Sequence, residues 1–515
     1  MVTNYLSYKC SVLPTKNVNL TLGKALSLTS GSITSTGGTL SFSDNLILGS
    51  SGALDVTGST LSVSGALDLS SGTFSSDNSS LDLQAATTLS ANDQVTGQNP
   101  VTFEDVHFNG NVLTLGSAST HLKVNDALAL SGIALETGAG SLTLSGALAL
   151  TDNASLNSSG GTITLKSGGT STGSVVSLPG TTLVLENPLS LTGATLKTNE
   201  TTFTTNTNAL TLSGGILEVE GVQDLGGVVP DNSTTLRLAA NSTIDDNASL
   251  SVGTLDLANF ALTLDDQMAG LSIAQPVTLD AAGEKLVTGA ADLSLNGGIS
   301  ATSGTLSSTG GTLGLPGGAT LASGALFSTS NTTLNLGGSL AVAGTWSGSN
   351  TTSISLTTDN ASLSSTVALS LASLQTNGHD FELASATTDL TIQNAFALSG
   401  GETLSTHGAD LIFESSADIS TESTLDAGDG GKFEFKQGGT ANGTINAENA
   451  TFKIGAAYAV PGTLRTNDNT TWDLGTSNLN LSGGRLYLGG DVVLDKVLTN
   501  NQTIFKLGED ATVTR

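Results

Sequence analysis

The chain is built from short units in which two apolar residues flank one small or polar residue. Examples are Ala-Leu-Asp-Val (53–56), Thr-Leu-Ser-Val (60–63) and Ala-Leu-Asp-Leu (66–69). This alternation is typical of a β-strand that buries one face. The sequence therefore predicts many short strands whose Leu, Val and Ile side chains point to the same side.

These units recur about every twenty residues. One series, in steps of 20 or 21 residues, passes through Leu40, Leu61, Leu81, Val101, Leu122, Leu142, Ile163, Leu183 and Phe203. A second passes through Leu46, Leu67, Thr87, Val106, Leu128, Leu148, Leu189 and Leu210. A third passes through Ile33, Leu54, Phe74, Val95, Leu113, Ile133 and Leu156. The register returns at Leu313, Leu334, Ile354 and Leu374, and at Leu390, Leu411, Phe433, Phe452 and Trp472.

Three series in one period predict three short strands per turn, separated by Ser-Gly, Gly-Gly, Asp-Asn or Thr-Gly corners. The fold we expect is all-β: one long parallel β-helix, or β-solenoid, of roughly twenty-five turns with strands about 4.8 Å apart. Right-handed winding is expected by analogy with other parallel β connections. An array of sandwich domains would need a recurrence near one hundred residues and hairpin turns. Gly-Val-Gln-Asp-Leu-Gly-Gly-Val-Val-Pro (221–230) is predicted to be a loop that bulges from a corner.

Composition supports this fold and divides the chain. Aromatic residues are 4% of the chain, as a narrow interior filled by small aliphatic side chains would require. Residues 1–24 hold three lysines and no acid, and we interpret them as an N-terminal segment or cap. Residues 25–425 form an acidic, Ser/Thr/Gly/Leu-rich solenoid, with five basic and 34 acidic residues. Residues 426–515, with eight basic and ten acidic residues, hold seven of the twenty aromatics and form the final turns.

The net charge of −28 disfavours nucleic acid and anionic membranes as partners, because like charges repel. The sequence has no apolar run long enough to span a bilayer, so direct membrane insertion is not expected. Cys10 is the only cysteine, which excludes an intrachain disulfide. The first ten residues lack the apolar segment of a signal peptide, so we expect the export signal outside this sequence.

Both ends of the chain are candidate contact surfaces. Tyr5, Leu6, Tyr8 and Val12 are candidates to plug the first turn, and residues 508–515 stop in mid-pattern. Because terminal turns of a solenoid expose unpaired strand edges, we expect either a longer polypeptide or a subunit whose ends are covered by neighbours.

The residues that usually carry chemistry are scattered. The four histidines, His107, His121, His379 and His407, are predicted at strand edges or corners, away from any metal cluster. Paired carboxylates that could cleave a polysaccharide are Asp245 with Asp246, Asp265 with Asp266, and Asp418 with Glu422. Acids at corners more often serve solubility. Calcium is the one cofactor considered, at 244–247 and 426–431.

The sequence also contains candidate residues for two surface functions, ice binding and sugar binding. Thr201, Thr202, Thr204 and Thr205 form a cluster of the kind that could order water in ice binding. Sugar binding would rest on exposed aromatics, for which the candidates are Trp346, Tyr458, Trp472 and Tyr487. Core packing is the commoner role of such aromatic residues. We assign no catalytic, cofactor-binding or metal-binding residue, and we expect no enzyme activity.

Residues 374–383 (Leu-Gln-Thr-Asn-Gly-His-Asp-Phe-Glu-Leu), residues 404–413 (Leu-Ser-Thr-His-Gly-Ala-Asp-Leu-Ile-Phe) and the recurrent Ser-Gly-Ala-Leu-Xaa-Leu units carry a family resemblance. In these stretches the chain resembles the large secreted β-helical adhesins, namely autotransporter passengers and filamentous-haemagglutinin-like proteins. This resemblance of pattern covers nearly the whole chain, and it implies surface display and cell adhesion.

The sequence thus predicts an extracellular structural or adhesive stalk on a cell surface. Its expected partners are a receptor or glycan on a host or neighbouring cell, or identical subunits that join end to end into filaments. The alternative hypothesis is a carbohydrate-active β-helix enzyme or a sugar-binding protein similar to phage tail spikes.

Overall fold

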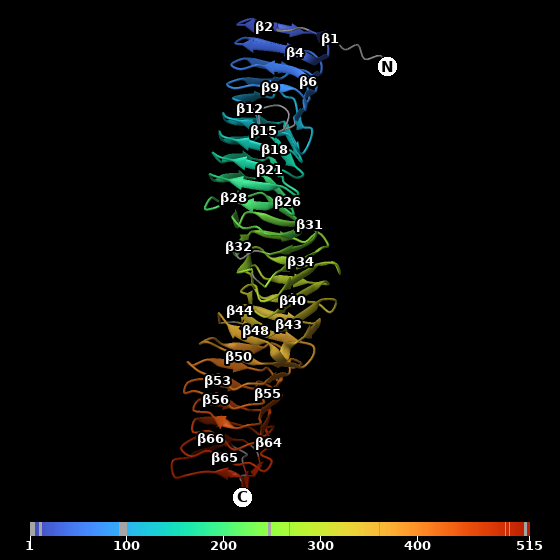
Figure 1. The fold of residues 1–515 in the computed structure, drawn as a ribbon. Coiled ribbons are helices and arrows are strands. Elements are labelled where there is room, and N and C mark those ends of the chain that lie inside the picture. Colours follow the sequence, from blue (N-terminus) through green and yellow to red (C-terminus); the bar gives the residue numbers. More distant parts are fainter. Residues whose placement is uncertain are drawn as a thin grey trace. The chain divides into compact units, whose positions relative to one another are not determined.

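The computed structural model is an all-β protein in which parallel strands stack as a β-solenoid of about 23 turns (Figure 1). It describes the chain except residues 1–5, 10–12, 92–99, 246–248, 267, 360, 490, 494, 509–511 and 515. The predicted fold class, an all-β parallel solenoid, is confirmed, and its right-handed winding stays a prediction. The residues form two compact units, Met1–Ala258 and Asn259–Arg515. The compositional boundaries near residues 24 and 425 concern charge and aromatic content rather than contacts, and they stay predictions.

In the first unit, corresponding strands of successive turns pair in parallel. One series of strands is β12 (Val101–Phe103), β15 (His121–Val124), β18 (Ser141–Leu144), β21 (Thr162–Leu165), β24 (Thr182–Leu185) and β27 (Thr202–Thr204). The next is β16 (Leu128–Ser131), β19 (Leu148–Thr151), β22 (Gly169–Thr172), β25 (Leu189–Thr192), β28 (Leu210–Ser213) and β30 (Val228–Pro230). The third includes β14 (Leu113–Leu115), β17 (Ala134–Gly138), β20 (Ser155–Ser158), β23 (Val175–Ser177), β26 (Thr195–Asn199), β29 (Ile216–Gln223), β31 (Thr235–Ile244) and β33 (Thr254–Asp256).

The second unit repeats this arrangement. One series is β35 (Gly270–Ile273), β38 (Asp292–Leu295), β41 (Thr312–Leu315), β44 (Thr333–Leu336), β47 (Ser353–Leu356) and β50 (Ser373–Gln375). Another is β49 (Leu369–Leu371), β52 (Leu390–Ile392), β55 (Asp410–Phe413), β58 (Lys432–Phe435), β61 (Thr451–Ile454) and β64 (Thr471–Asp473). The longest ends with β51 (Phe381–Leu383), β54 (Thr403–Ser405), β57 (Thr424–Asp426), β60 (Thr444–Asn446), β63 (Thr463–Arg465), β66 (Arg485–Leu488) and β69 (Ile504–Leu507).

Much of the predicted register is confirmed. Leu142 pairs with Ile163, Ile163 with Leu183, and Leu183 with Phe203. In the second unit, both predicted runs are paired as expected, from Leu313 to Leu374 and from Leu390 to Trp472. The paired Leu, Ile and Phe side chains face inward and fill the interior in columns. Leu142, Ile163 and Leu183 are at most 1% exposed.

In the first predicted series, the pairing of Val101 with Leu122 is confirmed, but that of Leu81 with Val101 is wrong. Leu81 in β10 (Ser80–Leu83) pairs with Val106 in β13 (Asp105–His107), not with Val101, which instead pairs with Leu122. The turn between Leu81 and Val106 is 25 residues long, and the twenty-residue step does not allow for that insertion. Val106 therefore leaves the second series. Val95 lies outside the described residues.

Two positions of the other series are displaced by two residues. Leu67 pairs with Leu89 rather than Thr87, and Leu113 pairs with Leu135 rather than Ile133. A shift of two keeps the same side chains on the same face, so an alternating pattern cannot distinguish the two registers. The predicted loop at 221–230 is also wrong, because β29 continues to Gln223 and β30 begins at Val228.

Aromatic side chains replace leucine in part of the second unit. The rings of Phe396, Phe413, Phe435 and Tyr458 form a column with centroid distances of 5.1, 5.2 and 4.4 Å. The Tyr458 hydroxyl donates to the Ala417 carbonyl oxygen at 3.0 Å. The larger residues predicted for the final turns are therefore mainly core residues.

Candidate ligand-binding surface

The histidines lie on the outside of the solenoid, each beside a polar partner. His107 lies 3.6 Å from Asp105, and His407 lies 3.4 Å from Glu382. The ring of His121 is within hydrogen-bonding distance of the Thr143 hydroxyl, at 2.9 Å. Within the described ranges, no three His, Cys, Asp or Glu side chains form a group that could hold a metal ion.

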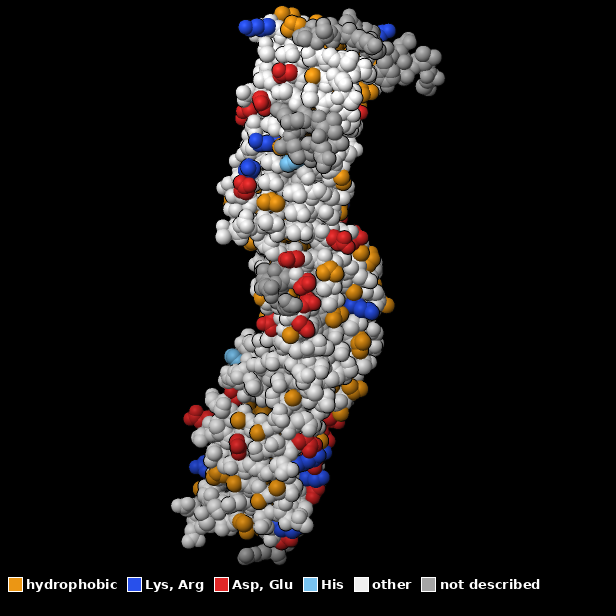
Figure 2. All heavy atoms as spheres, in the orientation of Figure 1, with side chains coloured by type: hydrophobic (Ala, Val, Ile, Leu, Met, Phe, Trp, Pro, Cys, Tyr) orange, Lys and Arg blue, Asp and Glu red, His pale blue; other side chains and the backbone are white. Residues whose placement is uncertain are grey.

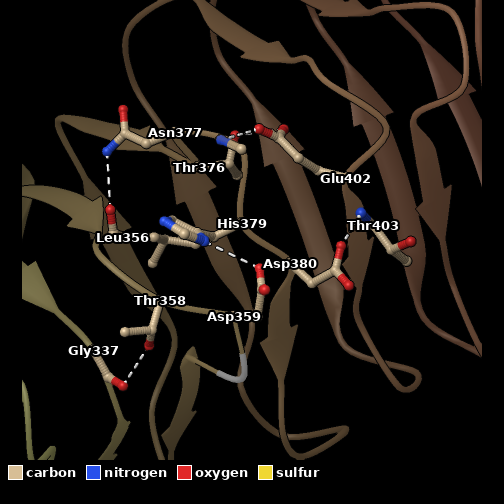
Figure 3. A network of polar contacts seen from close by, with 11 residues as sticks. Gly337, Leu356, Thr358, Asp359, Thr376, Asn377, His379, Asp380, Glu402 and Thr403 are labelled. Carbon is tan, nitrogen blue, oxygen red and sulfur yellow. Dashed lines mark hydrogen bonds and ion pairs between the residues drawn. The ribbon is translucent and has the colours of Figure 1, made fainter.

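Figure 3 shows the surroundings of His379, whose Nδ1 lies 3.1 Å from Asp359 Oδ1. In the same network Glu402 is only 2% exposed. Its carboxylate accepts hydrogen bonds from the Thr376 hydroxyl at 2.7 Å, the Ser399 amide at 2.9 Å and the Gly378 amide. This buried acid is saturated with donors from its own corner and from the preceding turn, so its role here is to join turns.

Two carboxylates from the predicted pairs also join turns. Asp266 accepts a hydrogen bond from the Ala290 amide at 2.7 Å, and Asp418 accepts one from the Thr440 amide at 2.8 Å. Each bond links a corner to the following turn. Glu422 is exposed at a corner. Asp265 also has an interaction partner, and Asp246 lies outside the described residues.

Residues 426–431, one of the two calcium candidates, have their carboxylates partnered by amides. Asp426 Oδ1 accepts from the Asn446 side chain at 2.9 Å, and Asp429 Oδ1 accepts from the Asn449 side chain at 2.9 Å. In the other candidate, 244–247, the last two residues are not described.

The threonine cluster at 201–205 is divided between the inside and the outside of the solenoid. Thr201 and Thr205 are buried, and the Thr201 hydroxyl donates to the Leu178 carbonyl oxygen at 2.7 Å. Thr202 and Thr204 face outward on β27. Half of the cluster is therefore part of the interior.

The four aromatic candidates differ in how far their side chains are buried. Tyr458 is 1% exposed and Trp346 is 8% exposed, and the Trp346 indole donates to the Thr329 hydroxyl at 2.8 Å. Trp472 is half-buried against Phe452, with ring centroids 5.8 Å apart. Tyr487, in contrast, points outward from β66 and packs against charged side chains.

Tyr487 is the centre of what we call the cationic–aromatic cluster, formed by Arg465, Arg485, Tyr487 and Lys506. The Arg465 guanidinium carbon lies 4.6 Å from the centroid of the Tyr487 ring, and the Lys506 nitrogen lies 5.0 Å from it. Hydrogen bonding to the Lys506 ammonium lowers the pKa of the Tyr487 phenol, and the charges of Lys506, Arg465 and Arg485 act in the same direction against a smaller effect of burial. All three cations are exposed.

A second group of charges on β55, β58, β61 and β64 differs because it is internally paired. We call it the ion-pair ladder. Lys432 lies 3.4 Å from Asp410 and 3.1 Å from Glu434, and Lys453 lies 3.3 Å from Glu434 and 3.7 Å from Asp473. Burial alone would raise the pKa of Glu434, but the two lysines hold it below its usual value. The drawn face in Figure 2 shows such mixed red and blue side chains toward the C-terminal end.

The described surface also contains hollows. A groove of about 700 Å³ lies along β13 and β16 and is lined by Asp105, His107 and Asp126, among others. An apolar pocket of about 650 Å³ is lined by residues between Leu13 and Ile33. The residues predicted to plug this region are either outside the described chain or, for Leu6 and Tyr8, described only in backbone. Cys10 is also outside it.

Comparisons with protein-family profiles, with curated proteins and with solved structures find no match to the chain. Within the part of the chain that the structure describes, no helix has the length and apolar character needed to cross a membrane.

The cationic–aromatic cluster was only partly anticipated from the sequence, which predicted Tyr487 as a candidate but missed its neighbours. The signal was present, because Arg465 and Lys506 are 22 and 19 residues from Tyr487, close to one turn on either side. Aligning the outward columns as well as the inward ones would have found it.

Proposed function

We propose that this protein is an extracellular structural or adhesive stalk, displayed on a cell surface, whose long stack of turns carries binding surfaces. The observation that carries the proposal is the solenoid itself, a fold of about 23 turns in which each of the two units is held together by parallel strand pairing and an apolar interior. A repeating stack of this kind gives a chain of small residues a large ordered surface. Two of the candidate catalytic acids, Asp266 and Asp418, support the proposal, because each accepts a hydrogen bond from an amide of the following turn and so links two turns.

The partner expected for such a stalk is a receptor or glycan on a host or neighbouring cell. Association between identical subunits is a second form of the same proposal. It is favoured by exposed apolar side chains on β69, where Ile504 is 45%, Phe505 40% and Leu507 58% exposed. A strand with exposed apolar side chains can associate with a second chain, through its backbone edge or through packing of those side chains.

Electron microscopy of the purified chain across a range of concentrations tests this proposal. Elongated particles whose length corresponds to about 4.8 Å per turn are expected for a stalk. Filaments of uniform width that appear at higher concentration would make self-association part of the function. Compact particles would contradict the stalk proposal.

Display is tested separately, in cells that produce the protein from its own gene. Antibody labelling of intact cells should detect the chain, and brief protease treatment of those cells should remove the signal. Labelling only after the cells are made permeable would overturn the extracellular assignment.

A further inference from the structure

We propose that the cationic–aromatic cluster binds an acidic polysaccharide through the carboxylate or sulfate groups of its sugars. The inference rests on the proposed function and deepens it, because it names a binding surface and a ligand class for the stalk. The surface is the outward face of β63, β66 and β69.

The strand register places these side chains in an ordered row. Arg465 pairs with Tyr487, and Tyr487 pairs with Lys506, so the three stand in one outward column. Arg485 stands in the neighbouring column, next to Thr463 on one side and Ile504 on the other. Three consecutive turns, about 4.8 Å apart, therefore each present one cation, with Arg485 two residues along the strand from the column that holds Arg465 and Lys506. A row of this kind matches an extended chain with repeated negative groups.

The charges of this cluster have no acidic partner among the described side chains. Among the residues that the structure describes, no carboxylate lies within ion-pair distance of Arg465, Arg485 or Lys506, whereas Lys432 and Lys453 in the ion-pair ladder each contact two acids. The chain has 16 Lys and Arg residues against 44 Asp and Glu residues, so cations are few overall. Unpaired and exposed cations remain available to an anionic ligand, and an arginine can hold a carboxylate or sulfate with two parallel hydrogen bonds.

The tyrosine determines which ligand fits. Arg465 and Lys506 both lie over the Tyr487 ring, so the aromatic ring holds the two cations in place by cation–π contact. Stacking of a neutral sugar or a nucleic-acid base on the ring would compete with these cations. Proteins that bind single-stranded nucleic acid stack bases on open aromatic faces, whereas the Tyr487 ring is already in contact with two cations. The cluster lies in the near-neutral residues 426–515, which hold eight basic and ten acidic residues, so the repulsion expected from the acidic part of the chain is weakest here. Exposed cations and a ring that is already in contact with two of them favour an acidic polysaccharide.

The test measures binding of the full chain to four immobilised probes: a polyuronate, dextran sulfate, neutral dextran and single-stranded DNA. We expect the polyuronate or dextran sulfate to bind, with the comparison between them distinguishing carboxylate from sulfate recognition. Affinity should fall with added salt, because the contacts are ionic. Neutral dextran binding equally well, or DNA binding more tightly than both acidic polysaccharides, would overturn the inference.

A matched pair of variants locates the site. R465Q/K506Q removes two cations from the cluster and should weaken binding by about tenfold or more. K432Q/K453Q removes two cations from the ion-pair ladder and should change affinity less than about twofold, since those lysines are already paired. Equal losses in both variants would mean that binding follows net charge alone, and the site would be wrong.

Tyr487 is tested as a positioning residue. Y487F keeps the ring beneath both cations and should bind as the parent chain does, whereas Y487A should bind more weakly and with a shallower salt dependence. Circular dichroism checks that every variant retains the β-solenoid. A parent chain that forms elongated particles but binds neither acidic polysaccharide would reject this site and leave the stalk proposal standing. Compact particles that still bind would reject the stalk alone.

Discussion

Glu402 is 2% exposed, and its carboxylate accepts three hydrogen bonds, from Thr376, Gly378 and Ser399. Asp231 is similar in the first unit, where its carboxylate accepts from Ser213 at 2.7 Å and from the Ser233 amide at 2.9 Å. The Ser213 hydroxyl and the Ser233 donors lower the pKa of Asp231 far below its usual range. At this scale, acids at corners stabilise the stacking of one turn on the next.

Replacing Glu402 tests this role. In Glu402→Ala, the buried Thr376 hydroxyl and two backbone amides lose their acceptor, and unsatisfied buried donors should cost about 2–4 kcal/mol of unfolding free energy. Urea unfolding followed by circular dichroism measures the loss. Glu422→Ala is the control, since Glu422 is exposed, and its effect should stay below about 0.5 kcal/mol.

Glu434 should make stability depend on pH. Its pKa is lower in the folded chain than in the unfolded one, because Lys432 and Lys453 favour the charged form. The stabilisation is therefore complete above the unfolded value, near pH 4.3, and is lost as the pH falls through the lower folded value. Glu434→Gln should lower stability at pH 7 and reduce its change between about pH 5 and 3. Parallel pH profiles for the variant and the parent would contradict this.

Strands and corners have different requirements, and the corners are the more demanding. Gly348 precedes the short helix η1 (Ser349–Thr351) with φ of 77°, in the left-handed region. A Cβ atom at this position would collide with the Thr329 carbonyl oxygen on β43 (Leu326–Ser330), in the preceding turn. Glycine is therefore needed here both for its backbone angle and for the close approach of two turns.

Two glycine substitutions separate these effects. Gly401 also has positive φ, at 89°, but a Cβ there would meet nothing within 4 Å. Gly401→Ala should cost about 1 kcal/mol for the backbone angle alone. Gly348→Ala should cost roughly 2 kcal/mol more, because the turns must move apart to relieve the clash. Thermal and urea unfolding of the two variants give the comparison, and equal losses would exclude a role for the close approach.

The alternating apolar pattern of the sequence specifies some strand pairings and leaves others undetermined. It identified the pairing of Leu142 with Ile163 and of Phe433 with Phe452, because large inward side chains recur there at a constant step. It could not choose between Thr87 and Leu89, which both face inward on β11 (Thr87–Ala91), nor locate the longer turn before Val106. Of the cationic–aromatic cluster only Tyr487 was predicted, because outward positions tolerate most polar residues and the one-turn spacing of Arg465 and Lys506 appears only when outward columns are aligned.

Across the whole molecule, each turn of either unit is held mainly by its two neighbours. Ser155 on β20 pairs with Ala134 in the turn before and Val175 in the turn after. In repeat proteins of this type, stability is approximately a sum over turns and the contacts between adjacent turns. One complete turn should therefore be removable without loss of the fold.

Deleting residues 155–174 tests this expectation. The deletion removes twenty residues (174 − 155 + 1), and Val175 and Val176 would then pair with Ala134 and Leu135. We expect the shortened chain to keep its circular dichroism spectrum and cooperative unfolding. Deleting residues 155–164 removes only half a turn and should cause misfolding or protease sensitivity, because every following strand in the unit then meets the wrong series. A half-turn deletion that folds as well as the full-turn deletion would contradict the model of independent turns.

Strand pairing between successive turns also has a mechanical consequence. The backbone hydrogen bonds point from one turn to the next, so tension applied across a stack of turns loads the bonds of one turn at a time rather than shearing a whole sheet. Each turn that peels away would release roughly 70 Å of extended chain, given about twenty residues at 3.3–3.6 Å each. Such a stack would yield in many small steps at modest force and would absorb work over a long extension.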